Sequence, residues 1–463
     1  MKEKESKTGR IAVIYSFGQI ADATAYQTFT FLVFTFYYAV VGINIMLITI
    51  GFIIWSIWNS LNDPLLGFIS DRTHTKWGRR MPYIMIGFIP LAITMLLVFS
   101  PLKSFGIVNE MANFVYFLIV ILVFELFYTM YSLNLTSMFP EVFITVKERT
   151  IANNVRQVFT IVGLIVAFIL PGLFISDYSD PNSMPQYQVF GLVCLLIIIV
   201  LVLIFIKFGP KEKAEFQQDY KNAPGFFGSI KICVKSKSFM WYIPSEITNW
   251  FVFGMLPTII PLYGKFVLGI QDSLLISLLL GLAFISAAIF ITILWKPLVR
   301  KIGNRKSWII SMSIWIVSLL PLMFIGKDML IISMIVFFFI GVGLSGSLYI
   351  IDLVVSDIID EDEVNTGMRR EASYYGVNAL FLRLTTVLIF LAISSVFTSV
   401  GWAVFEPKLI TPEIIFGLRT LIFIFPAIAL GVGILAMFKY PLDGERLLKV
   451  KENLEKIHEK KKA

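Results

Sequence analysis

The sequence predicts an all-α membrane protein with twelve transmembrane helices in two six-helix bundles. The 463 residues are 57% hydrophobic and only 15% charged, which is more apolar than an ordinary soluble domain. Apolar runs of about 20 residues, the length that a helix needs to cross a hydrocarbon core of about 30 Å, recur along the whole chain. One long polar interruption divides these runs into six and six.

Each run is expected to be helical. Unpaired backbone groups cannot face lipid, and the runs are too long and too uniformly apolar to be the strands of a barrel. The twelve predicted spans lie near 13–40, 45–70, 81–101, 113–139, 151–175, 187–207, 239–264, 273–298, 307–326, 329–356, 372–401 and 413–438.

The distribution of basic residues predicts the orientation. Most of the 39 Lys and Arg residues lie at the amino end, in the even-numbered loops and in the carboxyl tail. Because cytoplasmic loops retain positive charge, both termini are expected in the cytoplasm and the chain in the cytoplasmic membrane. The net charge of +8 therefore requires no nucleic acid as a partner, and the expected surroundings are the lipid bilayer.

The polar interruption at 207–237 predicts a cytoplasmic linker between bundles at 1–206 and 238–440, followed by a tail at 441–463. The stretch "DPLLGFISDRTHTKWGRR" follows the second span, and "KPLVRKIGNRK" follows the eighth. Both have Pro-Leu and then a basic turn with glycine, which is typical of the internal duplication found in many transporters. The preference for basic cytoplasmic loops offers an alternative explanation.

Enzyme chemistry has little support. The histidines are His74 and His458, both outside the predicted spans, so these residues offer little basis for a histidine-based triad or a histidine-rich metal site. Cys194 in the sixth span and Cys233 in the linker are not expected to form a disulfide. No metal or cofactor is expected apart from a coupling ion.

Polar side chains inside the spans indicate a functional cavity, because charge at bilayer depth costs a few kcal/mol and usually faces protein or water. On the first span, Tyr15, Gln19, Asp22 and Tyr26 share one helical face. Interhelical hydrogen bonding is the alternative for any single Thr, Ser or Asn. Similar stripes on the second, fourth and fifth spans are formed by Asn59, Asn62 and Asp63; by Glu125, Thr129, Ser132 and Thr136; and by Asn153, Arg156, Gln157 and Thr160.

Three motifs resemble the glycoside-pentoside-hexuronide:cation symporters, a branch of the major facilitator superfamily. They are "NDPLLGFISDRTHTKWGRRMP", "SMFPEVFITVKERTIANNVR" and "SDIIDEDEVNTGMRREASYYGVNALFLR", the last at the loop before the eleventh helix and at its start. The resemblance extends over essentially the whole chain. It implies the major facilitator fold, with a sugar site between two six-helix bundles and a cation site beside it.

The resemblance also assigns substrate-binding positions. Asp22 and Arg156 match sugar-binding residues, while Asn378 and Arg383 stand where a sugar symporter of this family has a glutamine and a lysine. The chain departs from the family at Ser132, which replaces an acid, and at Thr136 and Leu348, which replace tryptophans. If Arg156 and Arg383 both face the cavity, their guanidinium groups fit the carboxylate of a glucuronide or hexuronate.

Asn62, Asp63 and Thr129 match the family's cation site, in which Asn59 replaces an aspartate. The losses at Asn59 and Ser132 leave Asp63 as the remaining acid. A cluster of acids and amides suits Na⁺, whereas a single desolvated carboxylate suits a proton, so H⁺ is favoured over Na⁺.

The loop after the second span resembles the superfamily's cytoplasmic gate, where acids and bases are expected to pair across the bundles. Each exposed ion pair is worth only about 0–1 kcal/mol, so such a gate opens readily. The acidic run at 360–363 would complete the network. The candidate gate residues are Gly67, Asp71, Gly78, Arg79, Arg80, Arg149 and Arg370.

The sequence therefore predicts a secondary transporter that couples a cation to symport of a sugar or glycoside, acting as a monomer. Transport of a lysolipid or another amphipathic solute on the same fold is the alternative. A non-transporting sensor is disfavoured, because the tail is too short for a signalling domain.

Overall fold

The computed structural model describes residues 2–73, 75–143, 146–210, 226–367 and 370–462, which form helices, turns and short connections. Within these residues, eleven helices are long and apolar enough to cross a membrane. They coincide with the second to twelfth predicted spans, so the all-helical fold class is confirmed. The first predicted span is also helical, but Gln19, Asp22 and Gln27 make it more polar than the other eleven.

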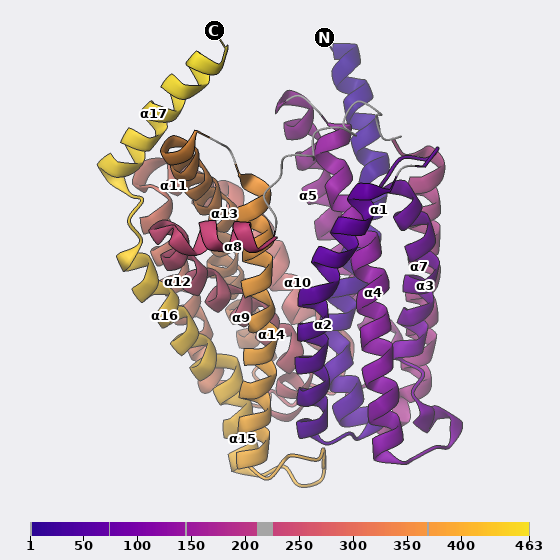
Figure 1. Ribbon diagram of the computed structural model, residues 1–463. Coiled ribbons are helices and arrows are strands. Elements are labelled where there is room, and N and C mark those ends of the chain that lie inside the picture. The colour runs from indigo at the N-terminus through magenta and orange to yellow at the C-terminus, as the bar shows by residue number, and fades with distance from the viewer. Residues whose placement is uncertain (1, 74, 144–145, 211–225, 368–369, 463) are drawn as a thin grey trace. The chain divides into compact units, whose positions relative to one another are not determined.

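The chain divides into two compact units, and unit 1 comprises Met1–Asn222, Ile270–Gly281 and Phe397–Ile410. Within it, helix α1 packs against α5 and α7, and α4 packs against α2 and α3 (Figure 1). The elements of this part of the chain are α1 (Lys2–Thr35), η1 (Phe36–Val41), α2 (Ile45–Arg72), α3 (Met81–Val98), η2 (Leu102–Phe105), α4 (Glu110–Val142), α5 (Val146–Ile169), α6 (Pro171–Phe174), η3 (Pro181–Ser183) and α7 (Met184–Phe208).

Small residues and end caps position these helices. A Cβ atom at Gly163 of α5 would lie 2.7 Å from the Cβ of Ala23, so glycine permits the close approach of α5 to α1. Two turns earlier on α5 is Arg156, which this approach brings toward α1. The side chain of Asn109 accepts a hydrogen bond from the Ala112 backbone N–H at 2.9 Å and caps the start of α4.

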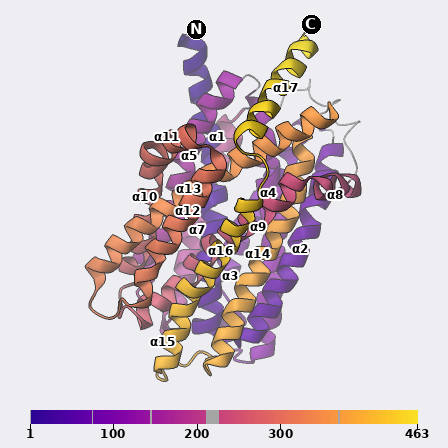
Figure 2. The ribbon, with the colours of Figure 1, turned by 90° about the vertical axis from the view of Figure 1, so that its left-hand side faces the viewer.

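Unit 2 comprises Ala223–Gly269, Leu282–Val396 and Thr411–Ala463, and helix α10 contributes to both units. Here α9 packs against α16, and α12 packs against both α13 and α16 (Figure 2). The elements are α8 (Phe226–Lys235), α9 (Lys237–Phe266), α10 (Ser273–Phe290), η5 (Ile291–Trp295), α11 (Lys296–Ile302), α12 (Asn304–Leu319), η6 (Leu320–Met323), α13 (Leu330–Thr366), α14 (Glu371–Ser399), α15 (Pro412–Arg419), η7 (Thr420–Ile424), α16 (Phe425–Lys439) and α17 (Gly444–Lys462).

The acidic run at 360–363 differs from the loop that its motif suggested. Helix α13 continues to Thr366 and carries all four acids in its last turns, with Glu363 only 1% exposed. The tail helix α17 docks beside them, because Arg446 forms an ion pair with Glu361 at 2.6 Å and Lys451 one with Asp360 at 2.6 Å. The Ser238 hydroxyl also donates a hydrogen bond to Glu361. These basic and hydroxyl partners offset the repulsion among the acids at this helix end.

Candidate functional site

Asp22 lies at the centre of a polar cluster in unit 1. It is half-buried on α1, and the Gln19 side-chain N–H donates to its Oδ2 at 3.0 Å. Tyr128 and Ser132 of α4 are near enough to hydrogen-bond the same carboxylate. The Ser132 hydroxyl in turn lies 3.3 Å from the Tyr128 hydroxyl. These side chains are all half-buried, although Asp22 Oδ1 itself is buried.

Arg156 joins this cluster from α5. Its guanidinium carbon lies 4.6 Å from the centre of the Phe139 ring, a cation–π contact, and its charge acts on Asp22. The structure therefore brings three predicted substrate residues together: Asp22, Ser132 and Arg156. Thr136, one turn further along α4, is exposed, and the structure gives it no contact with Asp22.

Sequence reasoning missed an aromatic pair beside Asp22. The rings of Tyr26 and Tyr128 stack with centres 4.9 Å apart. Tyr26 belongs to the polar face of α1, so its direction was recognisable, but its partner lies 102 positions away and left no local signal. Thr136 and Leu348 replace tryptophans of the family, but the stacked Tyr26 and Tyr128 rings still give the cluster an aromatic surface.

A second arrangement joins α2 and α4. The Thr129 hydroxyl lies 3.0 Å from Asp63 Oδ1 and 3.2 Å from Glu125 Oε1, so it bridges two carboxylates. We call Asp63, Thr129 and Glu125 the coupling triad, after the role that is proposed for them below. Glu125 is only 1% exposed, and a second carboxylate thus lies near Asp63, which is the remaining acid among the family's cation-site positions. The sequence showed Glu125 on the polar stripe of the fourth span, but not its proximity to Asp63.

Asn59 and Asn62 lie on α2 near the coupling triad. The Asn62 side-chain N–H donates to the backbone carbonyl of Glu125 at 3.2 Å. Both asparagines are fully buried, and the side-chain oxygens of both lack a hydrogen-bond partner among the described residues. These are oxygens of the kind that a hard cation binds.

The remaining predicted substrate residues belong to unit 2. The Asn378 side-chain N–H on α14 donates to Glu246 Oε1 of α9 at 2.9 Å, and Arg383 is half-buried five residues further along α14. Sequence reasoning did not single out Glu246, although a carboxylate inside the apolar run of the seventh span was a usable signal.

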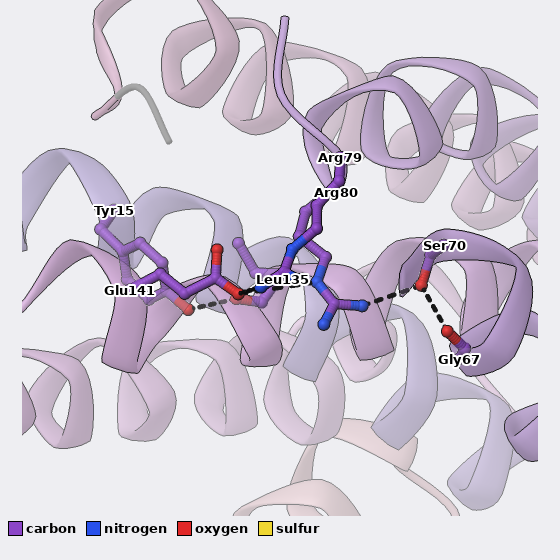
Figure 3. Close-up of polar contacts among 7 residues, drawn as sticks. All are labelled: Tyr15, Gly67, Ser70, Arg79, Arg80, Leu135 and Glu141. Atoms are coloured by element: carbon purple, nitrogen blue, oxygen red, sulfur yellow. Dashed lines mark hydrogen bonds and ion pairs between the residues drawn. The ribbon is translucent and has the colours of Figure 1, made fainter. Parts of the chain in front are cut away.

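Three of the predicted gate residues, Gly67, Arg79 and Arg80, belong to one polar network in unit 1 (Figure 3). Arg79 pairs with Glu141 of α4 at 2.6 Å, and the Arg80 Nε lies 3.8 Å from the same carboxylate. An Arg80 side-chain N–H also donates to the Ser70 hydroxyl at 2.8 Å, and that hydroxyl donates to the carbonyl of Gly67 at 3.1 Å.

Gly78 has a φ of +104°, a conformation that glycine adopts without strain in the turn before Arg79. Arg149 donates to the carbonyl of Phe143 at 2.8 Å. The side chain of Asp71 lies outside the described residues. Glu141, the acid that organises this network, was not among the predicted gate residues.

In unit 2, Arg370 binds both carboxylate oxygens of Asp362, at 2.8 and 2.5 Å. These hydrogen bonds to Asp362 raise the pKa of Arg370 above its usual value, against the opposing effect of burial. The gate pairs described at these positions thus join residues of the same unit, whereas the sequence predicted pairs across the bundles.

The model of the family described as "MFS/sugar transport protein" matches residues 14–444. An uncharacterized symporter of Synechocystis is 23% identical, with 95% of each chain covered. An isoprimeverose transporter of Lactiplantibacillus pentosus is 24% identical over 74% of this chain and 70% of its own. A sodium-dependent lysophosphatidylcholine symporter of Danio rerio is 20% identical over 84% of this chain and 77% of its own.

Among solved structures, the nucleoside transporter NupG has a TM-score of 0.66 at 16% identity, covering 94% of this chain and 100% of its own. The fold is therefore that of the major facilitator superfamily. The chain belongs to the MFS/sugar transport family. It is a multi-pass membrane protein that transports a small-molecule substrate, and it is not an enzyme.

Proposed function

We propose that this protein is a cation-coupled symporter of a sugar or glycoside. One observation supports coupling above all others: helix α4 contributes to both polar arrangements of unit 1. Thr129 belongs to the coupling triad, while the adjacent Tyr128 and nearby Ser132 approach Asp22. A cation that changes the position of α4 would therefore change the substrate cluster, which is the differential binding that symport needs.

We assign substrate binding in unit 1 to Asp22, Arg156 and the stacked Tyr26–Tyr128 pair. Carboxylate, guanidinium and phenol groups together accept and donate hydrogen bonds to sugar hydroxyls. A uronate would require an uncompensated positive charge in the site. Here the negative charge of Asp22 offsets the positive charge of Arg156. We therefore expect neutral glycosides to bind better than glucuronides or hexuronates.

We assign coupling to Asp63, Thr129 and Glu125, with H⁺ as the ion. Two carboxylates that share one hydroxyl repel each other when both are ionised, and a single proton removes that repulsion. Na⁺ is the competing ion, because Glu125 adds a second carboxylate and so removes the single-acid argument for H⁺ that the sequence offered. The unpartnered side-chain oxygens of Asn59 and Asn62 also favour Na⁺.

The test is uptake into proteoliposomes of purified protein, with a panel of neutral glycosides, uronates and lysolipids under imposed pH or Na⁺ gradients. We expect a pH gradient to drive accumulation of a neutral glycoside. Asp63→Asn should abolish accumulation while retaining exchange, and Asp177→Asn in the loop after α6 should behave as wild type. Accumulation by Asp63→Asn equal to that of wild type would remove this residue from the coupling role.

Transport of an amphipathic solute remains the second candidate, because the Danio rerio relative is named for lysophosphatidylcholine. The half-buried polar cluster around Asp22 favours a hydroxylated head over an acyl chain. Competition separates the two: a lysolipid substrate would not be displaced by a large excess of glycoside.

The distribution of Lys and Arg supports a plasma-membrane location with both termini in the cytoplasm. We further propose bundles at 1–206 and 238–440, joined by the linker at 207–237, and a monomer as the functional form. Accessibility of cysteines introduced near each end to an impermeant reagent tests the orientation.

A further inference from the structure

Phe29 of α1 lies between an aromatic ring of α2 and one of α4. Its ring stacks on Trp55 of α2, with centres 5.5 Å apart and planes at 27°, and on Phe124 of α4, with centres 4.4 Å apart and planes at 1°. None of the three side chains is more than 2% exposed. We call Trp55, Phe29 and Phe124 the Phe29 sandwich, in which α2 and α4 hold a ring of α1 between them.

The coupling triad joins the same two helices, α2 and α4. Trp55 precedes Asp63 by eight residues, and Phe124 precedes Thr129 by five, which places the sandwich about 12 Å and about 8 Å along these helices from the triad. Two ionised carboxylates at the triad repel each other, and a bound cation removes that repulsion, so binding favours a smaller separation of α2 and α4. In a close-packed interior, a ring held on both faces responds to that separation.

The sandwich also leads to the polar cluster around Asp22. Phe29 follows Asp22 by seven residues on α1, so the two side chains share one face of that helix. The stack continues on α4, where the Phe124 and Tyr128 ring centres are 5.8 Å apart with planes at 8°, and Tyr128 stacks on Tyr26 of α1. Tyr128 is near enough to hydrogen-bond Asp22, so both routes end at the same carboxylate.

We propose that Phe29 is a positioning residue that couples cation binding at the triad to sugar binding at Asp22, an inference that rests on the function proposed above. It acts through the position of α1 and not by contact with either ligand. A cation that draws α2 and α4 together changes the gap that holds Phe29, and with it the position of Asp22. A sugar that holds Asp22 and Tyr128 in place constrains the same gap, so each ligand raises the affinity for the other.

The first part of the test is calorimetric titration of two neutral disaccharides, isoprimeverose and lactose, into the purified protein. Titrations in acidic and alkaline buffer, with Na⁺ or with choline, give a coupling factor, which is the ratio of sugar affinities with and without the cation. Coupled sites commonly show a factor of about 5- to 150-fold. If wild type binds neither sugar, or binds with no dependence on H⁺ or Na⁺, the proposed symport fails and the role of Phe29 fails with it. If wild type shows a coupling factor, the variants decide that role separately.

Phe29→Leu should lower the coupling factor about 2- to 30-fold while sugar still binds in the presence of the cation. Phe31→Leu is the matched control, because Phe31 is a buried phenylalanine on the same helix that contacts Phe168 and Tyr178 instead. Its coupling factor should equal that of wild type. Should Phe29→Leu fail to unfold cooperatively on heating, Phe124→Leu carries the test with the same expected reduction.

Trp55 separates ring stacking from hydrogen bonding. Its Nε1 has no hydrogen-bond partner among the described residues, so Trp55→Phe, which keeps a ring and removes the N–H, should retain the coupling factor, whereas Trp55→Leu should lower it. An unchanged coupling factor in Phe29→Leu, or in Phe124→Leu where that variant carries the test, would overturn the proposal. An equal reduction in Phe31→Leu would also overturn it, by showing a general effect of looser packing around α1. A reduction in Trp55→Phe would assign the coupling to the indole N–H and reject the stacked rings.

Discussion

Glu141 provides the sharpest test of the network around Arg79. Arg79 and Arg80 are only 2% and 4% exposed, and Glu141 is 7% exposed. Its carboxylate lies 2.6 Å from Arg79 and 3.8 Å from Arg80, so Glu141→Gln removes a negative charge that lies close to two buried cations. Loss of one partner from a buried pair costs about 3–5 kcal/mol, because the remaining charge stays desolvated.

For a unit of this size, such a loss corresponds to a fall in the unfolding midpoint of roughly 6–20 °C. The assay is thermal unfolding of purified protein in detergent. Glu413→Gln, at an exposed position on α15, is the control and should change the free energy of unfolding by no more than about 0.5 kcal/mol.

A double-mutant cycle then isolates the pair. Arg79→Gln with Glu141→Gln should be less destabilising than the sum of the single changes, by about 0.5–3 kcal/mol, since either single change already removes the attraction between the two side chains. A midpoint for Glu141→Gln equal to that of wild type would refute the reasoning. Additive single changes would show that Arg79 and Glu141 do not stabilise each other.

Three further predictions concern unit 2. Gly346→Ala should destabilise by about 1–3 kcal/mol, because its Cβ would lie 2.4 Å from the Trp295 ring, whereas Gly376→Ala meets nothing within 4 Å and should not destabilise. Lys451→Met should speed proteolysis of α17. Burial lowers the pKa of Lys451, but hydrogen bonds to two aspartates raise it, and the net result is a pKa above the usual 10.5. Docking of α17 should therefore persist below pH 10.5 and weaken as the pH rises through the raised pKa. Burial raises the pKa of Cys233 to about 12, so maleimide should label it far more slowly than glutathione at pH 7.

Much of the fold was predictable, because the cost of unsatisfied backbone groups in lipid leaves the helix as the form of each apolar run. The helical face of Asp22 was also predictable, since the 3.6-residue period fixes which side chains share a stripe. Its meeting with Arg156 was implied by the family resemblance alone. Residue spacing does not reveal the close approach of α1 and α5 at Gly163 that makes it possible.

The misses have a common physical cause. Glu141, Glu246 and Tyr128 each contact a partner that is distant in the sequence, and local patterns contain no information about that partner. Glu246 was recognisable as an acid in an apolar run, but its significance depends on Asn378, 132 positions away. The burial of the acidic run on α13 likewise depends on Arg446 and Lys451 from the tail helix.

The coupling triad shows how a site can keep its charge when a family residue is lost. Asn59 stands where the family resemblance implies an aspartate on the second helix, yet Glu125 on α4 reaches the same Thr129 hydroxyl as Asp63. A cation responds to the charge and distance of the oxygens around it, not to the helix that supplies them. Comparison of aligned positions would therefore count one acid here, whereas the folded chain presents two. On this argument, Glu125→Gln should impair cation-driven accumulation as strongly as Asp63→Asn, and a Glu125→Gln variant that accumulates substrate normally would show that the second carboxylate does not replace the lost aspartate.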